Sequence, residues 1–135
     1  MTVQKKVYKK VGKIDKVLAD DIGLDYYGDV YISRGAFNHI LKKHGKQFTK
    51  NIKDNLSIII ERIIGNPDFI GKSKRRGESA LRIVKKVDAY IMLVLEVDKE
   101  EGYMYVATMY PLTKSKLKNS IYSGSLLETN KGVGI

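Results

Sequence analysis

The chain's two histidines lie close together, and they are the only two in its 135 residues. His39 and His44 both fall in the run from Ser33 to Gly45, which has the pattern of a short amphipathic helix. Ser33 is a preferred N-cap residue, and Gly45 suits the left-handed position that follows many helix ends. Because histidine exchanges protons readily near neutral pH, this segment is the first candidate for acid–base chemistry.

The two histidines should point in different directions. At about 100° per residue, their spacing separates them by roughly 140° around the helix. His44 ends an apolar stripe that is formed by Phe37, Ile40 and Leu41, whereas His39 lies outside it. This argues against one metal ion held by both and favours His44 in a site, with His39 in reserve. A His44 that fills the core edge and bonds to a backbone carbonyl fits the position equally well.

The densest charge lies in the segment 72–86, where seven basic residues face one acidic residue, Glu78. The basic residues are Lys72, Lys74, Arg75, Arg76, Arg82, Lys85 and Lys86. Phosphates would relieve the repulsion among these cations and release counterions, so we expect them to bind a nucleic acid rather than to form only a solvated surface. Gly71 and Gly77 bracket the first part, which predicts a mobile loop over the ligand.

A predicted strand ends with two hydroxyl groups. Alternation along the strand places Thr108 and Tyr110 on one face and Ala107 and Met109 on the other. Hydroxyls at a strand end suit contact with a phosphate, although Thr and Tyr are also ordinary strand formers. The residues that follow are expected to extend the basic surface: Lys114, Ser115 and Lys116.

Length and composition narrow the class of protein. A chain of 135 residues is most simply one domain, which we place at residues 13–135, after a basic lead-in or linker at residues 1–12. The absence of cysteine excludes a disulfide framework, a cysteine zinc site and a thiol nucleophile. No apolar run reaches the roughly 18 residues of a membrane helix, so we expect a soluble protein. The net charge of +10 favours a polyanionic partner over simple solubility.

Hydrophobic periodicity predicts helices in the first half of the chain and strands in the second. The helices are expected at residues 14–22, 34–44 and 49–64, with a brief extended piece at 29–32. The strands are expected at residues 69–70, 80–87, 90–97 and 103–110. The strand 90–97 is apolar almost throughout, as a central strand covered on both faces would be. The predicted fold class is α+β, with N-terminal helices packed on a C-terminal antiparallel β-meander sheet.

Three short stretches carry a resemblance to a known family. They read His39-Ile-Leu-Lys-Lys-His44-Gly, Ile-Gly-Asn-Pro67-Asp68-Phe-Ile and Val-Ala-Thr108-Met-Tyr. Over about residues 30–116 the chain resembles the barnase/EndoU/colicin/RelE-type nucleases, in particular their phage-associated and contact-dependent growth inhibition toxin branches. The resemblance implies a BECR-like fold and a ribonuclease that cuts RNA, often transfer RNA, with no metal or other cofactor.

The resemblance also implies a mechanism and a set of residues. In it the RNA 2'-hydroxyl attacks the adjacent phosphate, which gives a 2',3'-cyclic phosphate. The residues to which it points are His44 with His39 in reserve, a cation such as Arg82 or Lys86, Thr108 and Tyr110. No glutamate stands at an obvious position for a barnase-like base, so the expected mechanism depends on histidine and cations.

The implied partners are RNA, in particular tRNA, and an acidic immunity protein that covers the basic cleft; otherwise the chain is expected to be a monomer. A toxin domain of this kind would act in the cytoplasm of a target cell, and a phage or mobile-element protein in that of its host. Two other classes remain open, a non-catalytic nucleic-acid-binding module and a phage structural domain. Cleavage of RNA without metal separates the nuclease from both.

Overall fold

One mixed sheet organises the molecule. The computed structural model describes residues 8–75 and 78–129, and in these ranges the strand order is β1-β2-β6-β5-β4-β3-β7. The strands are β1 (Tyr8–Ile14), β2 (Gly28–Ser33), β3 (Phe69–Arg75), β4 (Glu78–Val87), β5 (Ala89–Asp98), β6 (Tyr103–Pro111) and β7 (Leu127–Glu128). Neighbouring strands are antiparallel except β2 and β6, which pair in parallel at Val30–Met104 and Tyr31–Tyr105.

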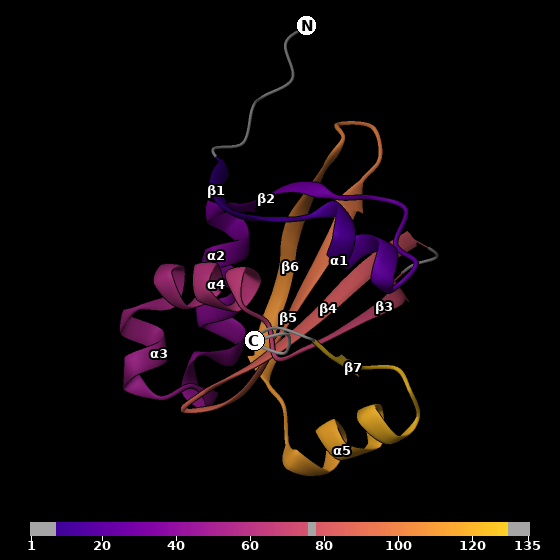
Figure 1. Cartoon of the computed structure of the whole chain (residues 1–135). Helices are drawn as coiled ribbons and strands as arrows, with labels where there is room; N and C mark the ends of the chain where they lie inside the picture. The colour runs from indigo at the N-terminus through magenta and orange to yellow at the C-terminus, as the bar shows by residue number, and fades with distance from the viewer. Residues whose placement is uncertain (1–7, 76–77, 130–135) are drawn as a thin grey trace, which may run out of the picture.

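The helices lie in two groups, with the short first helix apart from both. They are α1 (Lys16–Asp21), α2 (Arg34–His44), α3 (Lys50–Asp54), α4 (Leu56–Gly65) and α5 (Lys114–Tyr122), with a 3-10 turn η1 (Gly45–Gln47) after α2. Figure 1 shows α2, α3 and α4 gathered at one side and α5 below the sheet. The side chains of Ser33, Thr49 and Thr113 accept hydrogen bonds from backbone N–H groups in the first turns of α2, α3 and α5. None of the helices in the described ranges is long and apolar enough to cross a membrane.

The α+β class is confirmed, but the predicted order of helices before sheet is wrong. Strands β1 and β2 precede α2 and pair with each other, and β2 joins the sheet beside β6. Residues 8–12 of the expected lead-in belong to β1, and residues 1–7 lie outside the described ranges. The sequence hid this strand because, among the described side chains of β1, only Val11 and Ile14 reach the core, between lysines of the kind that protect edge strands. A single domain over residues 13–135 remains a prediction.

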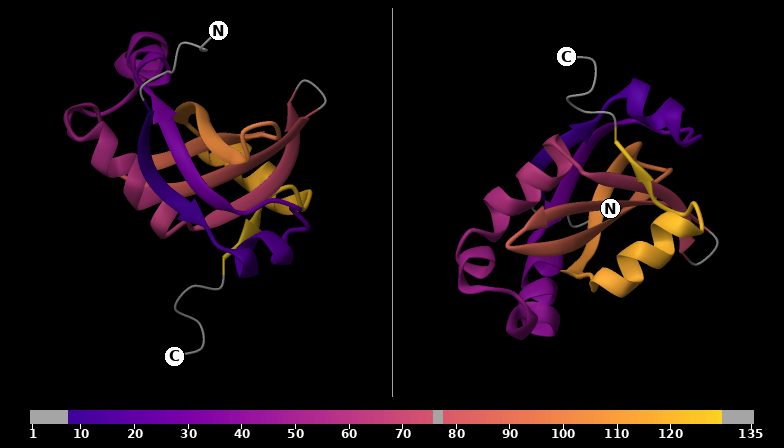
Figure 2. Two further views of the ribbon diagram at one scale, coloured as in Figure 1. Left: turned by 90° about the horizontal axis from the view of Figure 1, so that it is seen from above. Right: turned by 60° about the horizontal axis from the view of Figure 1, so that its bottom comes forward.

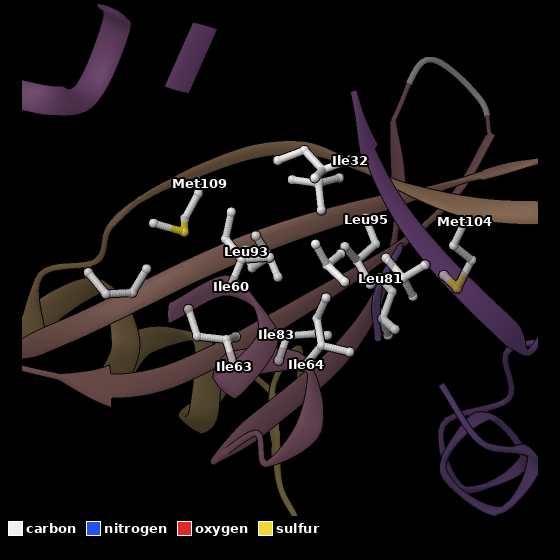
Figure 3. Close-up of a cluster of buried hydrophobic side chains, with 14 of the residues drawn as sticks. Ile32, Ile60, Ile63, Ile64, Leu81, Ile83, Leu93, Leu95, Met104 and Met109 are labelled. Atoms are coloured by element: carbon white, nitrogen blue, oxygen red, sulfur yellow. The ribbon is translucent and has the colours of Figure 1, made fainter. Parts of the chain in front are cut away.

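The main core lies between α4 and one face of the sheet, here called the α4 face. Figure 3 shows Ile60, Ile63 and Ile64 of α4 against Ile83 and Leu93 of the strands, and all five are buried. The isoleucine stripe therefore packs as the sequence predicted. The predicted helix 49–64 is nevertheless divided, because the backbone at Asn55 (φ −121°, ψ 29°) leaves the helical region and separates α3 from α4.

A second apolar cluster covers part of the opposite face, here called the α5 face. Its buried members are Val84, Met92, Val94, Leu112, Leu117 and Leu126. Both views in Figure 2 place α5 across β4 and β5 from α4. Strand β5 contributes to both clusters, which confirms its prediction as a central strand. Helix α5 was not predicted, since Leu117 is its one buried residue and a lysine-rich helix of this kind has no apolar stripe to recognise.

A β-bulge in β6 changes which residues share a face. Thr108 lies opposite Val94 and Val106 lies opposite Leu95, so Ala107 is the extra residue between them. Thr108 and Tyr110 lie opposite Val94 and Met92, which places both on the α5 face as predicted. The prediction that Ala107 shares a face with Met109 is wrong, because Ala107 packs in the α5-side cluster whereas Met109 is buried on the α4 face.

Candidate active site

Helix α2 brings His44 to the end of β6. Strand β2 runs parallel to β6 and ends at Ser33, where α2 begins. The helix then continues beside the rest of β6. The rings of His44 and Tyr110 meet there, with centroids 5.7 Å apart and planes tilted by 43°. Both side chains are half-buried, which leaves each of them in contact with solvent.

A glutamine orients the imidazole of His44. Its Nδ1 lies 2.8 Å from Oε1 of Gln47. Because an amide oxygen only accepts, the tautomer that fits this contact carries its proton on Nδ1 and donates it, and the neutral ring then has its lone pair on Nε2. Gly45 makes the contact possible, since it is in the right-handed region (φ −55°, ψ −37°) and continues into η1. The predicted left-handed Gly45 is therefore wrong, and Gln47 is a candidate site residue that the sequence did not identify.

His39 lies on the same helix but outside the apolar stripe, as predicted. It is exposed, whereas Ile40 beside it is completely buried. The structure thus separates the two histidines as the helical spacing indicated. The choice of His44 over His39 as the proton carrier remains a prediction.

Arg82 and Thr108 stand in one row across the sheet. Arg82 of β4 pairs with Val94 of β5, and Val94 pairs with Thr108 of β6. Two strand spacings separate them by about 10 Å, on the α5 face. Arg82 Nη2 donates to the carbonyl oxygen of Ser125 at 3.2 Å, and its enclosed Nε has no hydrogen-bond partner among the described residues. The guanidinium is therefore held in place by the segment that follows α5.

Lys86 and the first turn of α5 lie beyond Tyr110, on the side away from Arg82 and Thr108. The Lys86 amino group stands 5.6 Å from the centroid of the Tyr90 ring, and the Tyr90 carbonyl accepts a hydrogen bond from Leu112 N at 2.8 Å. That bond fixes the start of α5 near this lysine. The first turn of α5 holds no acidic residue, and its exposed side chains include Lys114, Ser115 and Lys116. The partial positive charge of the helix N-terminus adds to these cations.

The basic segment 72–86 does not gather on one face. Lys72 follows Ile70 onto the α4 face and donates to the Gly23 carbonyl at 2.9 Å, and Lys85 donates there to the Asn66 carbonyl at 2.9 Å. Arg82 and Lys86 lie on the α5 face. Arg76 and the side chains of Lys74 and Arg75 fall outside the described part of the chain.

Gly71 does not begin a mobile loop. It is buried in β3 opposite Arg82, and a Cβ there would collide with the Ser125 carbonyl oxygen. The expectation that Gly71 frees the segment to move over a ligand is therefore wrong. Glycine is required here because another backbone approaches closely.

A glutamate also stands on the α5 face. Glu96 accepts a hydrogen bond from the Tyr105 hydroxyl at 2.7 Å, one row beyond Arg82 and Thr108. The sequence carried a signal that the prediction overlooked, since Glu96 is the one charged residue in the apolar stretch 90–97. A lone carboxylate in a central strand is seldom placed for packing.

These side chains can move a proton and hold an anion. His44 Nε2 can accept a proton, the hydroxyls of Thr108 and Tyr110 can bind oxygen atoms, and Arg82 and Lys86 supply positive charge. In the described ranges, no group of three or more His, Asp or Glu side chains is placed to hold a metal ion.

Comparison with known proteins gives one family. No curated protein and no solved structure matches the chain significantly. A family model matches residues 9–119, a range that includes every candidate residue of the site and all of β1 except its first residue. The family suggests nuclease activity, in agreement with the resemblance found in the sequence. The chain belongs to the phage-Barnase-EndoU-ColicinE5/D-RelE like nuclease3 family.

Proposed function

We propose that the chain is a metal-independent endoribonuclease. The observation that carries this proposal is the contact of His44 with Tyr110 beside Thr108, in a member of a nuclease family. RNA contains its own nucleophile, the 2'-hydroxyl, so cleavage requires proton transfer, orientation and stabilisation of charge on the phosphate. Histidine, hydroxyl groups and cations supply these three functions.

In the proposed reaction His44 Nε2 takes the proton of the 2'-hydroxyl. The 2'-oxygen then forms a bond to phosphorus while the bond from phosphorus to the 5'-oxygen breaks. The products are a 2',3'-cyclic phosphate and a 5'-hydroxyl. The hydrogen bond from His44 Nδ1 to Gln47 supports this role, because it leaves the Nε2 lone pair available. The Tyr110 phenol donates a hydrogen bond to the leaving 5'-oxygen, which takes a proton from solvent water to become the 5'-hydroxyl, and His44 returns its proton to solvent. The Thr108 hydroxyl positions the phosphate.

The cations stabilise the charge that develops on the phosphate and hold its neighbours. Arg82 and Lys86 lie one row to either side of the row that contains Tyr110, on the far strand β4. This arrangement supports roles for both cations at the reacting phosphate and at the next phosphates along the RNA. The first turn of α5 offers Lys114 and Lys116 to a phosphate beyond the cut.

Total RNA in the presence of EDTA tests the proposal. The protein should produce fragments with 2',3'-cyclic phosphate and 5'-hydroxyl ends, which end-group analysis identifies. Fragments that appear only after divalent metal is added, or that carry 5'-phosphates, would reject the mechanism. Intact RNA at every condition would reject the nuclease and leave a binding module or a phage structural domain.

The proposal extends to tRNA as the substrate and to an acidic immunity protein as the inhibitor of a monomeric toxin. The family and the net charge of +10 support this extension. Such a toxin would act in the cytoplasm, either of a target cell or of the host of a phage or mobile element. Mapping of the cleavage sites in total RNA tests the choice of tRNA, because cuts spread evenly over ribosomal RNA would reject it.

A further inference from the structure

An open pocket of about 520 Å³ lies at the end of β6 away from His44. Four tyrosines and two carboxylates dominate its lining: Tyr26, Tyr27, Tyr31, Tyr103, Asp29 and Glu101. The proposed cleavage chemistry uses none of them. The pocket forms where the segment before β2 meets the turn between β5 and β6.

The walls of this tyrosine pocket are held in place. The rings of Tyr31 and Tyr103 meet edge to face with centroids 5.3 Å apart. The Tyr26 hydroxyl donates to the Gly102 carbonyl, which ties the segment before β2 to the turn after β5. Burial raises the pKa of the Tyr26 phenol, with Asp29 adding to the effect, so it remains a neutral donor. The aromatic surfaces are therefore organised before any ligand arrives.

The pocket lining holds two carboxylates and no cationic side chain, in a protein with a net charge of +10. Lys10 lies 3.0 Å from Asp29, and the Tyr31 hydroxyl donates to the same carboxylate at 3.4 Å. Glu101 is exposed and has no ion-pair partner among the described residues. Carboxylates repel phosphate and accept hydrogen bonds from N–H groups. The pocket thus suits a flat ring with amino groups rather than the RNA backbone.

The tyrosine pocket and the His44 site share one face of the sheet. Tyr31 alternates with the core residues Val30 and Ile32, which puts it on the α5 face. Tyr103 and Met104 alternate in the same way. The bulge at Ala107 then keeps Tyr110 on that face too. The distance along β6 from Tyr103 to Tyr110 is about 20 Å, which is enough for several nucleotides of a single strand.

We propose that the tyrosine pocket binds an unpaired nucleobase of the RNA substrate, one with an exocyclic amino group, in preference to uracil. The inference rests on the proposed ribonuclease function and adds a base-reading subsite to it. Tyrosine rings stack on any base, and a carboxylate accepts from the amino group of adenine, cytosine or guanine. Uracil has no amino group, and its single donor, N3–H, is flanked by two carbonyl oxygens that a carboxylate repels, so it is disfavoured.

Binding of RNA that cannot be cut tests the pocket apart from the chemistry. The full chain is titrated against fluorescent 2'-O-methyl decamers of A, C and U, which have no free 2'-hydroxyl. Tyr103→Leu should weaken binding of the A and C decamers about tenfold and affect the U decamer less. Glu101→Gln should bring the affinities for C and U together. The matched controls are Tyr122→Leu and Glu100→Gln, since Tyr122 is 95% exposed on α5 and Glu100 does not line the pocket.

The outcomes separate the pocket from the nuclease. If both pocket variants bind all decamers as the parent does, the pocket is rejected, and a cationic side chain of a protein partner becomes its fitting occupant. Parallel cleavage of total RNA then shows whether the nuclease stands without it. Pocket-dependent binding by a parent that cuts nothing keeps the pocket and rejects the nuclease. A parent that binds no decamer rejects the pocket. Circular dichroism checks that each variant is folded. If Tyr103→Leu does not fold, the result for Glu101→Gln alone decides whether the pocket is kept or rejected.

Discussion

The backbone of Gly71 in β3 lies directly beneath the carbonyl group of Ser125, with no room between them for a Cβ. The same carbonyl oxygen accepts a hydrogen bond from Arg82, and β7 continues the contact by pairing with β3. The segment after α5 is therefore fastened to the sheet at the row that holds Arg82. Stability and the placement of this cation are linked there.

Gly71→Ala should destabilise the protein by about 1 to 3 kcal/mol or more, because the new methyl group must displace the Ser125 backbone. Urea unfolding measures the change. Gly65→Ala is the matched control, since its Cβ would meet nothing within 4 Å and its backbone has no positive φ that would strain an alanine. Equal stability of the two variants would mean that the Ser125 segment does not hold its position.

His44→Ala should reduce the rate of RNA cleavage about 10²- to 10⁴-fold, because the proposed proton acceptor is lost. Affinity for uncleavable 2'-O-methyl RNA should stay near that of the parent. His39→Ala is the matched control and should retain most activity, since His39 is exposed outside the stripe. Loss of activity in His39→Ala alone would exchange the roles of the two histidines. Full activity in both would exclude histidine chemistry.

Gln47→Ala should slow cleavage by up to about a hundredfold without a comparable loss of RNA affinity. The amide holds Nδ1 of His44 at 2.8 Å and so fixes which nitrogen faces the substrate. Single-turnover rates and the affinity for uncleavable RNA separate the two effects. Lys46→Ala changes the exposed neighbour and serves as the control. A rate equal to that of the parent would show that His44 needs no such orientation.

Ile60→Ala should lower the free energy of unfolding by about 2 to 5 kcal/mol, because the side chain is completely buried between α4 and the sheet. Ile58→Ala on the same helix is the control. Its side chain is 55% exposed, so its loss should cost less than about half a kcal/mol. Denaturant unfolding of both variants gives the comparison, and similar losses would contradict the observed face of α4.

Asp88 should contribute to stability in a pH-dependent way. Hydrogen bonds from Asn51 and then Thr49 lower the pKa of its carboxyl group. The stabilisation is therefore fully present above the unfolded pKa of about 3.9 and is lost as the pH falls through the lower folded value. The parent should lose more thermal stability between pH 5 and pH 2 than Asp88→Asn does.

Asparagine is a suitable replacement for Asp88, because it also tolerates the positive φ of 62° at this turn. The control is Asp25→Asn, which removes an exposed carboxylate without a hydrogen bond to the described residues. It should leave the pH dependence of the parent unchanged. The same acid-induced loss in Asp88→Asn and the parent would remove Asp88 from this role.

The sequence predicted those parts of the fold that repeat a simple pattern. The isoleucines of α4, the apolar strand β5 and the caps at Ser33 and Thr49 each obey a local rule that the structure confirms. Strand β1 and helix α5 were missed because each buries few side chains and is placed by tertiary contacts. Local signals of this kind do not reveal a parallel pair such as β2 and β6.

The candidate site shows the same division. Helical spacing separated His44 from His39, and alternation placed Thr108 with Tyr110. Gln47 and Glu96 were not selected, because their contacts depend on a 3-10 turn and on cross-strand register. The basic segment was treated as one surface, although strand pairing sends Lys72 and Arg82 to opposite faces. Charge counted along a chain says little about the face on which it lies.

The extra residue at Ala107 has a consequence for how this strand can evolve. Removing its codon would make Val106 and Thr108 neighbours, opposite Leu95 and Val94, so the strand would alternate regularly and the residues that follow would keep their faces. The phenol of Tyr110 would stay on the α5 face, and Met109 would stay in the core. A further residue inserted into β6 without a bulge of its own would instead exchange the sides of Tyr110 and Met109, so this strand should tolerate the loss of Ala107 more readily than the gain of another residue.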